Sequence, residues 1–180
     1  MKKILAGLAA ATMITGGADA KTLVAYYSRT GNTMNVANEI ATATDADMFR
    51  IETSDANYYP AEYTATTQQA QREIRDGTLP PIKTIPDLSQ YDVIFIGTPC
   101  WWGTMAPPVR TFLSDADLSG KTVIPFNTHG GSGVANVHAD IADLTPNSKH
   151  LSGIAVYGSM SKTSGDTVQA WLKEIGIPSE

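Results

Sequence analysis

Hydroxyl and amide side chains are concentrated in one short loop of the chain, Ser28-Arg29-Thr30-Gly31-Asn32-Thr33. The β-branched and aromatic run before it, Thr22 to Tyr27, predicts a strand, and apolar residues at helical spacing follow from Met34. A helix N-terminus leaves backbone N–H groups unpaired, and its dipole favours an anion. The side chains of the loop can add donors, and Gly31 lets the backbone approach a ligand closely. The loop therefore predicts a site for a phosphate monoester, with Arg29 either pairing with it or pointing outward.

Two further loops carry unusual residues. One contains adjacent tryptophans and the other is rich in glycine, and they read Thr98-Pro99-Cys100-Trp101-Trp102-Gly103-Thr104 and Asn127-Thr128-His129-Gly130-Gly131-Ser132-Gly133. Tryptophans in a loop are costly to leave in water, and a flat aromatic cofactor offers them a surface for stacking. Glycines allow backbone groups to reach the polar edges of such a ring. His129 can bind a substrate oxygen or supply a proton, or it can simply shape the loop.

The elements that must position these loops alternate between strand and helix. Tyr91–Gly97 is a continuous apolar run, which is typical of a strand covered by helices on both faces. Helical patterns separate the strands, and we expect a capping box at Asp166 and Gln169 to open the last helix. The pattern predicts an α/β fold, a doubly wound parallel sheet whose ligands bind at the carboxyl ends of the strands. The five expected strands are Thr22–Tyr27, Asp47–Glu52, Tyr91–Gly97, Lys121–Phe126 and Leu151–Tyr157.

The first loop matches neither the nucleotide-triphosphate loop Gly-x-x-x-x-Gly-Lys-Ser/Thr nor the dinucleotide fingerprint Gly-x-Gly-x-x-Gly. It resembles the phosphate loop of flavodoxins, Ser/Thr-x-Thr-Gly-x-Thr. Together with the Trp-Trp-Gly loop and the His-Gly-Gly loop, it is similar to a bacterial subgroup of flavodoxin-like proteins. The resemblance covers nearly all of residues 21–180 and implies a flavodoxin-like five-stranded sheet with strand order 2-1-3-4-5.

The resemblance also implies that FMN is the cofactor. Trp102 falls where flavodoxins stack an aromatic residue on the flavin, and Gly103 falls where a peptide flips on reduction. Thr104 and His129 stand where many flavodoxins have an acidic residue and a tyrosine. The implied cofactor-binding residues are Ser28, Arg29, Thr30, Gly31, Asn32, Thr33, Thr98, Pro99, Cys100, Trp101, Trp102, Gly103, Asn127, Thr128, His129, Gly130, Gly131 and Gly133.

Residues 1–20 differ from the rest of the chain. Lys2 and Lys3 precede an apolar run, and Ala18-Asp19-Ala20 follows it. This is the layout of a secretory signal peptide with an Ala-x-Ala cleavage site, and the apolar run is short for a membrane span. We expect cleavage after Ala20, export from a bacterial cytoplasm to the periplasm or medium, and no membrane insertion of the mature domain, residues 21–180.

The mature chain is acidic, with 11 basic and 17 acidic residues remaining after removal of residues 1–20. Such a charge makes nucleic acid a poor partner. Cys100 is the only cysteine, which excludes an intramolecular disulfide and a multi-cysteine metal site.

Three functions remain open from the sequence. The first is an FMN-binding electron carrier that serves a redox partner protein. The second is an FMN-dependent NAD(P)H:quinone-type reductase that uses His129 as a catalytic residue, because reductases of this class also place a His-Gly-Gly segment beside the flavin. The third is a binding domain that kept the fold without the flavin, because fold alone does not decide function.

Overall fold

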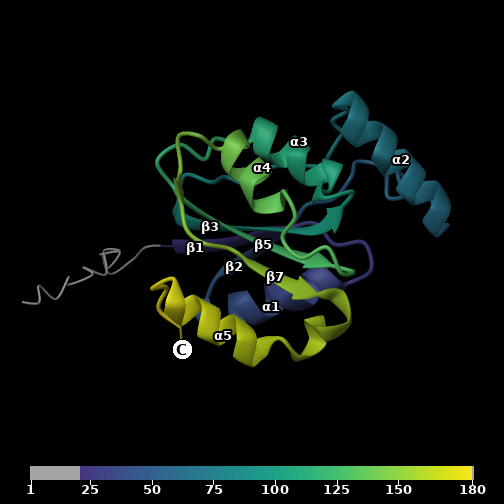
Figure 1. Ribbon diagram of the computed structural model, residues 1–180. Coiled ribbons are helices and arrows are strands. Elements are labelled where there is room, and N and C mark those ends of the chain that lie inside the picture. Colours follow the sequence, from purple (N-terminus) through teal and green to yellow (C-terminus); the bar gives the residue numbers. More distant parts are fainter. Residues whose placement is uncertain (1–20, 180) are drawn as a thin grey trace, which may run out of the picture.

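The computed structural model describes residues 21–179, and the predicted signal peptide, residues 1–20, lies outside them. Strands and helices alternate along the chain, as predicted (Figure 1). The strands are β1 (Lys21–Tyr26), β2 (Asp47–Arg50), β3 (Tyr91–Trp101), β4 (Thr104–Met105), β5 (Thr122–His129), β6 (Lys149–His150) and β7 (Ile154–Tyr157). The helices are α1 (Asn32–Thr44), α2 (Tyr63–Asp76), α3 (Pro107–Asp115), α4 (Val137–Leu144), the 3-10 helix η1 (Gly158–Thr163) and α5 (Gly165–Glu174).

The sheet has the order β2-β1-β3-β5-β6, and β7 also pairs with β5. All of these pairings are parallel. The expected order 2-1-3-4-5 is therefore confirmed: the expected fifth strand, Leu151–Tyr157, corresponds to β7, and the two-residue strand β6 precedes it outside the expected range. The structure adds one antiparallel element that the sequence analysis missed, because β4 folds back on the end of β3.

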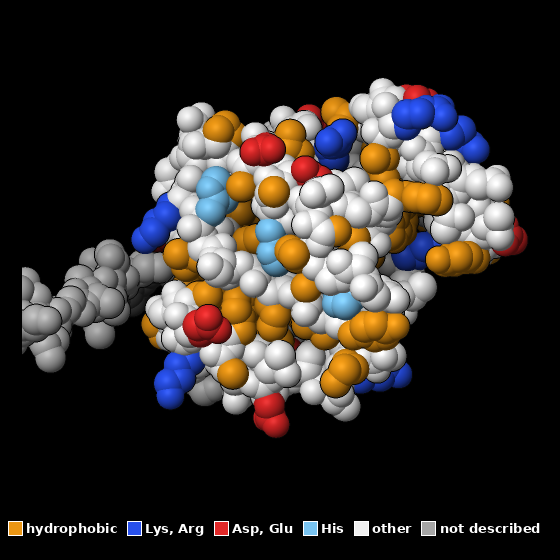
Figure 2. Space-filling view, viewed as in Figure 1, with side chains coloured by type: hydrophobic (Ala, Val, Ile, Leu, Met, Phe, Trp, Pro, Cys, Tyr) orange, Lys and Arg blue, Asp and Glu red, His pale blue; other side chains and the backbone are white. Residues whose placement is uncertain are grey.

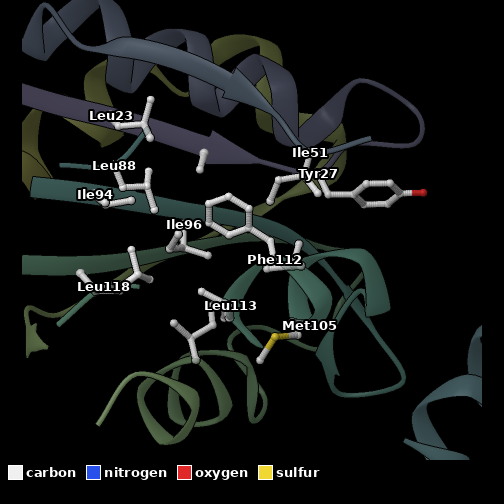
Figure 3. Close-up of a cluster of buried hydrophobic side chains, with 14 of the residues drawn as sticks. Leu23, Tyr27, Ile51, Leu88, Ile94, Ile96, Met105, Phe112, Leu113 and Leu118 are labelled. Carbon is white, nitrogen blue, oxygen red and sulfur yellow. The ribbon is translucent and has the colours of Figure 1, made fainter. Parts of the chain in front are cut away.

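Helices cover both faces of the sheet: α1 and α5 lie on one face, and α3 and α4 on the other (Figure 1). Successive side chains of β3 point to opposite faces of the sheet. Ile94 and Ile96 pack under α3 and α4 with Phe112 (Figure 3), whereas Phe95 packs with the α1 and α5 side chains. The continuous apolar run of β3 is explained by this double burial.

Helix α2 is different, because it lies beside the sheet rather than over it (Figure 1). It buries only Thr66, Ala70 and Glu73. Glu62 caps its start by accepting from the N–H groups of Thr64 and Ala65 at 2.7 and 2.6 Å. These two bonds lower the pKa of the Glu62 carboxyl, since they stabilise its charged form. The helix is thus specified locally, by its cap and its polar sequence, more than by core packing.

Some boundaries differ from the sequence predictions. The second strand ends at Arg50 rather than Glu52, because Arg50 pairs with Tyr26, the last residue of β1. Beyond it, Thr53 makes an isolated antiparallel bridge to Ile82. The predicted capping box of α5 is wrong: Ser164 precedes the helix, Asp166 lies inside its first turn, and no side chain caps it. Among residues 21–179, no helix combines the length and the apolar character that crossing a membrane requires.

Gly97 is the point of closest packing within the sheet. It pairs with Phe126 across β3 and β5, and a Cβ atom at Gly97 would lie 2.1 Å from Cζ of that buried ring. We predict that Gly97→Ala lowers the free energy of unfolding by about 2–3 kcal/mol, because the ring must move in a dense core. Denaturant titration measures this loss. Gly130→Ala is the matched control, since its added Cβ meets no atom within 4 Å, and an equal loss in both variants would contradict the prediction.

Candidate functional site

A cavity of about 540 Å³ opens at the carboxyl ends of the central strands. Its wall comes from the three loops singled out by the sequence, from α2, and from the segment after β7. Hydrophobic side chains gather on the surface between α2 and the body of the molecule (Figure 2). The lining residues are Ser28, Arg29, Thr30, Asn32, Thr33, Tyr63, Thr66, Thr67, Ala70, Pro99, Cys100, Trp101, Trp102, Thr128, His129, Gly130, Tyr157, Gly158 and Ser159.

The first loop places the N-terminus of α1 at this cavity. Gly31 holds the N-cap position with φ of 94°, and no side chain caps the helix. The Gly31 N–H instead donates to Ser28 Oγ at 3.2 Å, which closes the turn. The Thr33 and Thr128 hydroxyls are hydrogen-bonded at 2.8 Å and tie this loop to the third one. An uncapped helix start among neutral hydroxyl and amide groups is suited to a phosphate.

Arg29 connects the first loop to α2. Its Nη2 donates to the carbonyl oxygens of Pro60 and Ala61 at 3.1 and 3.0 Å and to Thr66 Oγ1 at 3.2 Å. Trp102 holds the helix from the other side, since its Nε1–H donates to the Thr67 carbonyl at 2.9 Å. The peripheral helix α2 is thereby fixed as a wall of the cavity. Arg29 lines the cavity, but its Nη2 is hydrogen-bonded to the α2 segment and is not free for a ligand.

The tryptophan loop is a tight hairpin between β3 and β4. Trp101 pairs with Thr104, and the two residues of the turn, Trp102 and Gly103, have φ of 52° and 81°. Positive φ at both turn positions is the type I′ pattern, which matches the twist of a hairpin and strains a residue such as Trp102. The Gly103 carbonyl accepts from the Asn136 N–H at 2.9 Å. A flip of the Gly103 peptide would therefore have to break a bond to the start of α4.

The two tryptophans occupy different environments. Trp101 packs edge-on against Tyr27 and Tyr59, with ring centroids 5.7 and 5.2 Å away. Trp102 is 55% exposed at the rim of the cavity, so its ring is the one with a face open to a ligand. Thr104 stands where many flavodoxins have an acidic residue. Its hydroxyl donates to the Asp140 carboxylate of α4. A carboxylate thus stands behind this loop although none is in it.

Tyr59 is held by a buried carboxylate. Its hydroxyl donates to Glu73 Oε2 at 2.7 Å, and Gln69 Nε2 donates to Oε1 of the same group at 2.9 Å. Burial, followed by the bond to Glu73, raises the pKa of Tyr59 well above its usual range, and burial chiefly raises the pKa of Tyr58 to about 12. Both phenols stay protonated at neutral pH. The network therefore positions the ring that supports Trp101.

His129 lies in the third loop with a defined hydrogen-bonding role. Its Nδ1 accepts from the Gly131 N–H at 3.0 Å, and its ring meets Tyr157 edge-on at 5.3 Å. The Tyr157 hydroxyl donates to the Gly130 carbonyl at 3.1 Å. Since Nδ1 is an acceptor, the neutral imidazole carries its proton on Nε2.

The structure brings most of the predicted ligand residues together, with six exceptions. Gly31, Gly103, Gly131 and Gly133 shape the loops without lining the cavity, and Thr98 and Asn127 are buried beneath it. Thr98 Oγ1 accepts from the Ala106 N–H at 2.9 Å, and Asn127 Nδ2 donates to the Gly133 carbonyl at 3.0 Å. These residues support the loops from below.

Part of the cavity wall was not predicted from the sequence. The cavity is lined by four residues of α2 and by the last residue of β7: Tyr63, Thr66, Thr67, Ala70 and Tyr157. The polar sequence of α2 indicates a surface helix and carries no signal for the face it turns to a ligand. The one usable hint was Arg29, a charged residue in a loop of otherwise neutral donors, but its partners are 31 to 37 residues away.

The parallel order, the helix N-terminus and the aromatic-lined cavity at the strand ends together define a doubly wound α/β protein with a site for a phosphorylated aromatic ligand. Comparison with known families is consistent with this class. A flavodoxin family model matches residues 21–175, and the chain belongs to the flavodoxin family.

Solved structures similar to this chain come from several bacteria. A candidate flavoprotein from Bacteroides eggerthii is 31% identical, with a TM-score of 0.76 over 87% of this chain and 98% of that one. A flavoprotein from Lactobacillus acidophilus, solved in complex with FMN, is 25% identical, with a TM-score of 0.66 over 80% of this chain and 97% of that one.

Curated relatives include proteins named NAD(P)H dehydrogenase (quinone). The one from Azorhizobium caulinodans is 32% identical over 129 residues, which are 62% of this chain and 60% of the relative. The one from Cupriavidus metallidurans is 30% identical over 141 residues, which are 69% of this chain and 65% of the relative. The chain therefore spans less than two thirds of the length of these relatives.

Proposed function

We propose that this chain is an FMN-binding flavodoxin that transfers electrons to or from a redox partner protein. FMN is the cofactor supported by the family membership and by the Lactobacillus acidophilus complex. One observation carries the proposal: the uncapped N-terminus of α1 opens into the 540 Å³ cavity, whose rim holds the exposed Trp102 ring. In the proposed complex the phosphate lies at Ser28–Thr33 and the flavin ring against Trp102.

The residues present fit this cofactor. The cavity volume lies within the range of about 300–1,000 Å³ that is usual for small-molecule sites. The phosphate would meet hydroxyl, amide and backbone N–H donors, since Arg29 Nη2 is engaged by α2. The Nε2–H of His129 is available to donate to an acceptor atom of the ring. When bound, FMN supplies the redox chemistry, and these residues supply binding, orientation and exclusion of water.

Thr30 provides a direct test of the phosphate site. It is exposed, and no hydrogen bond of its side chain is present within residues 21–179. We predict that Thr30→Val weakens FMN binding about 5–10-fold, because one donor to a charged group is lost while the shape is kept. Quenching of flavin fluorescence on titration measures the dissociation constant.

Riboflavin and a second variant serve as controls for Thr30→Val. Riboflavin lacks the phosphate, so its affinity should be the same for Thr30→Val and the unchanged protein. Thr42→Val replaces an exposed threonine of α1 that does not line the cavity, and it should leave FMN affinity unchanged. Equal losses for FMN and riboflavin would place the phosphate elsewhere. Failure of the unchanged protein to bind FMN would reject the proposed function.

A quinone reductase is the second candidate, favoured by the names of the curated relatives and by the position of His129 on the cavity wall. In that reaction NAD(P)H and a proton reduce a quinone to its hydroquinone, and His129 Nε2 would deliver a proton to the quinone oxygen.

Turnover separates the carrier from the reductase. For a carrier, we expect the FMN-loaded protein to oxidise NADPH in the presence of benzoquinone no faster than free FMN does. Saturable turnover that falls at least tenfold in His129→Asn would favour the reductase instead, because asparagine retains an acceptor for Gly131 but lacks the Nε2–H. His150→Asn is the distant control, since His150 bonds Thr145 away from the cavity.

We also propose export to the periplasm or the medium, based on the layout of residues 1–20 alone. After expression of the full chain in a bacterium, intact-mass measurement of the extracytoplasmic fraction should give a protein that begins at Lys21. Recovery of only the full-length chain from the cytoplasm would contradict this proposal.

A further inference from the structure

A second, smaller cavity of about 270 Å³ lies beside the first loop and shares Ser28 and Arg29 with the larger one. Tyr27 and Tyr59 form its aromatic lining. The remaining lining residues are Arg50, Ile51, Glu52, Thr53, Ala56 and Lys83. Neither the family's phosphate loop nor the proposed electron transfer gives this cavity a role.

The charge of this cavity is opposite to that of the chain. Arg29, Arg50 and Lys83 line it together with a single carboxylate, Glu52, whereas the chain as a whole carries a net charge of −5. Lys83 Nζ and Glu52 Oε2 are 3.2 Å apart, and both side chains are about half exposed. The positive charges of the two arginines are therefore not balanced by a carboxylate in the lining of the cavity, and the local electrostatic field favours an anion.

Both arginines keep N–H donors that are not used by any group within residues 21–179. Arg50 donates through Nη2 to the Ser28 carbonyl at 3.1 Å, and Arg29 donates through Nη2 alone to the α2 segment. A guanidinium carries five N–H bonds in a fixed fork, and forks of this kind bind carboxylates and phosphates in pairs of hydrogen bonds. The bond to Ser28 fixes one end of Arg50 and so orients the rest of its fork.

Tyr27 adds a hydroxyl at the outer end of a nearly buried side chain. The residue is 8% exposed, and its hydroxyl has no hydrogen-bond partner within the described chain. Figure 3 shows its ring leaving the core with the hydroxyl at the outer end, in agreement with its place in the wall of this cavity. Burial raises the pKa of Tyr27 to about 12 against the opposing effect of Arg29 and Arg50. The hydroxyl is therefore protonated at neutral pH and able to donate.

We propose that this cavity is a second anion site, which binds a small phosphate or carboxylate through Arg50, Lys83 and the Tyr27 hydroxyl. Its volume is about half that of the larger cavity, which suits a small oxyanion better than a second cofactor. Arg50 links the two sites physically, because it holds the carbonyl of Ser28 in the first loop. The site itself does not depend on flavin binding.

Calorimetric titration of the FMN-loaded protein tests the proposal, since FMN occupies the phosphate loop. Inorganic phosphate and succinate are the two probes, each at constant ionic strength, and the tighter one identifies the ligand chemistry. We expect saturable binding to one site. Lys83→Gln should weaken it at least threefold, Arg50→Gln at least tenfold, and Tyr27→Phe three- to tenfold, because each removes one donor or charge.

The controls separate a built site from a general effect of charge. Arg75→Gln removes a positive charge from α2 outside both cavities, where Arg75 pairs with Asp76, and it should bind the probes unchanged. Lys83→Gln leaves the first loop untouched, so it keeps the test valid if Arg50→Gln disturbs Ser28. Heats that match a sodium chloride titration, or equal affinity in all variants, would overturn the proposal. Flavin absorbance in the same samples reports FMN occupancy separately.

Discussion

The parallel pairing of β1, β3 and β5 is the constraint on which the site depends. Tyr26 pairs with Gly97, and Gly97 pairs with Phe126, so the three strands are aligned at this level of the sheet and run to the same edge, although β3 and β5 extend beyond the end of β1. Loops separated by about a hundred residues in the chain therefore meet at one edge, where Thr33 and Thr128 are hydrogen-bonded. The close contact between Gly97 and the Phe126 ring fixes this level, because neither strand can shift without opening the core.

A second constraint determines which part of that edge is enclosed. The helix α2 contributes little to the core, yet Arg29 and Trp102 hold it against the loops from two sides. Both contacts join a side chain to backbone or hydroxyl oxygen of the α2 segment, so they depend on direction as well as distance. The depth of the cavity thus comes from polar contacts at the periphery rather than from the hydrophobic core.

The same polar contacts distribute positive charge around the first loop. Arg29 and Arg50 each bind protein oxygen with one nitrogen, on either side of Ser28. The loop itself retains neutral donors, which suits a phosphate whose charge is balanced by a helix N-terminus. Both arginines line the smaller cavity, and Arg29 lines the larger one as well. The two proposed anion sites therefore differ in character although they lie next to each other in an acidic chain.

Local sequence was sufficient to predict the fold class and the three loops, whereas the strand order was implied by the resemblance to flavodoxins. Apolar runs reveal burial on both faces, and Gly31 with its hydroxyl neighbours reveals a helix start, because both are properties of consecutive residues. The capping of α5, the hairpin at Trp102 and Gly103, and the wall formed by α2 were not predictable in this way. The placement of Gly103 and the α2 wall depend on partners far along the chain: Asn136 for Gly103, and Pro60 to Thr66 for Arg29. The sequence alone determined which residues could bind a phosphorylated aromatic ligand. Only the tertiary structure decided which of them face the cavity, since that depends on side-chain direction and packing between distant segments.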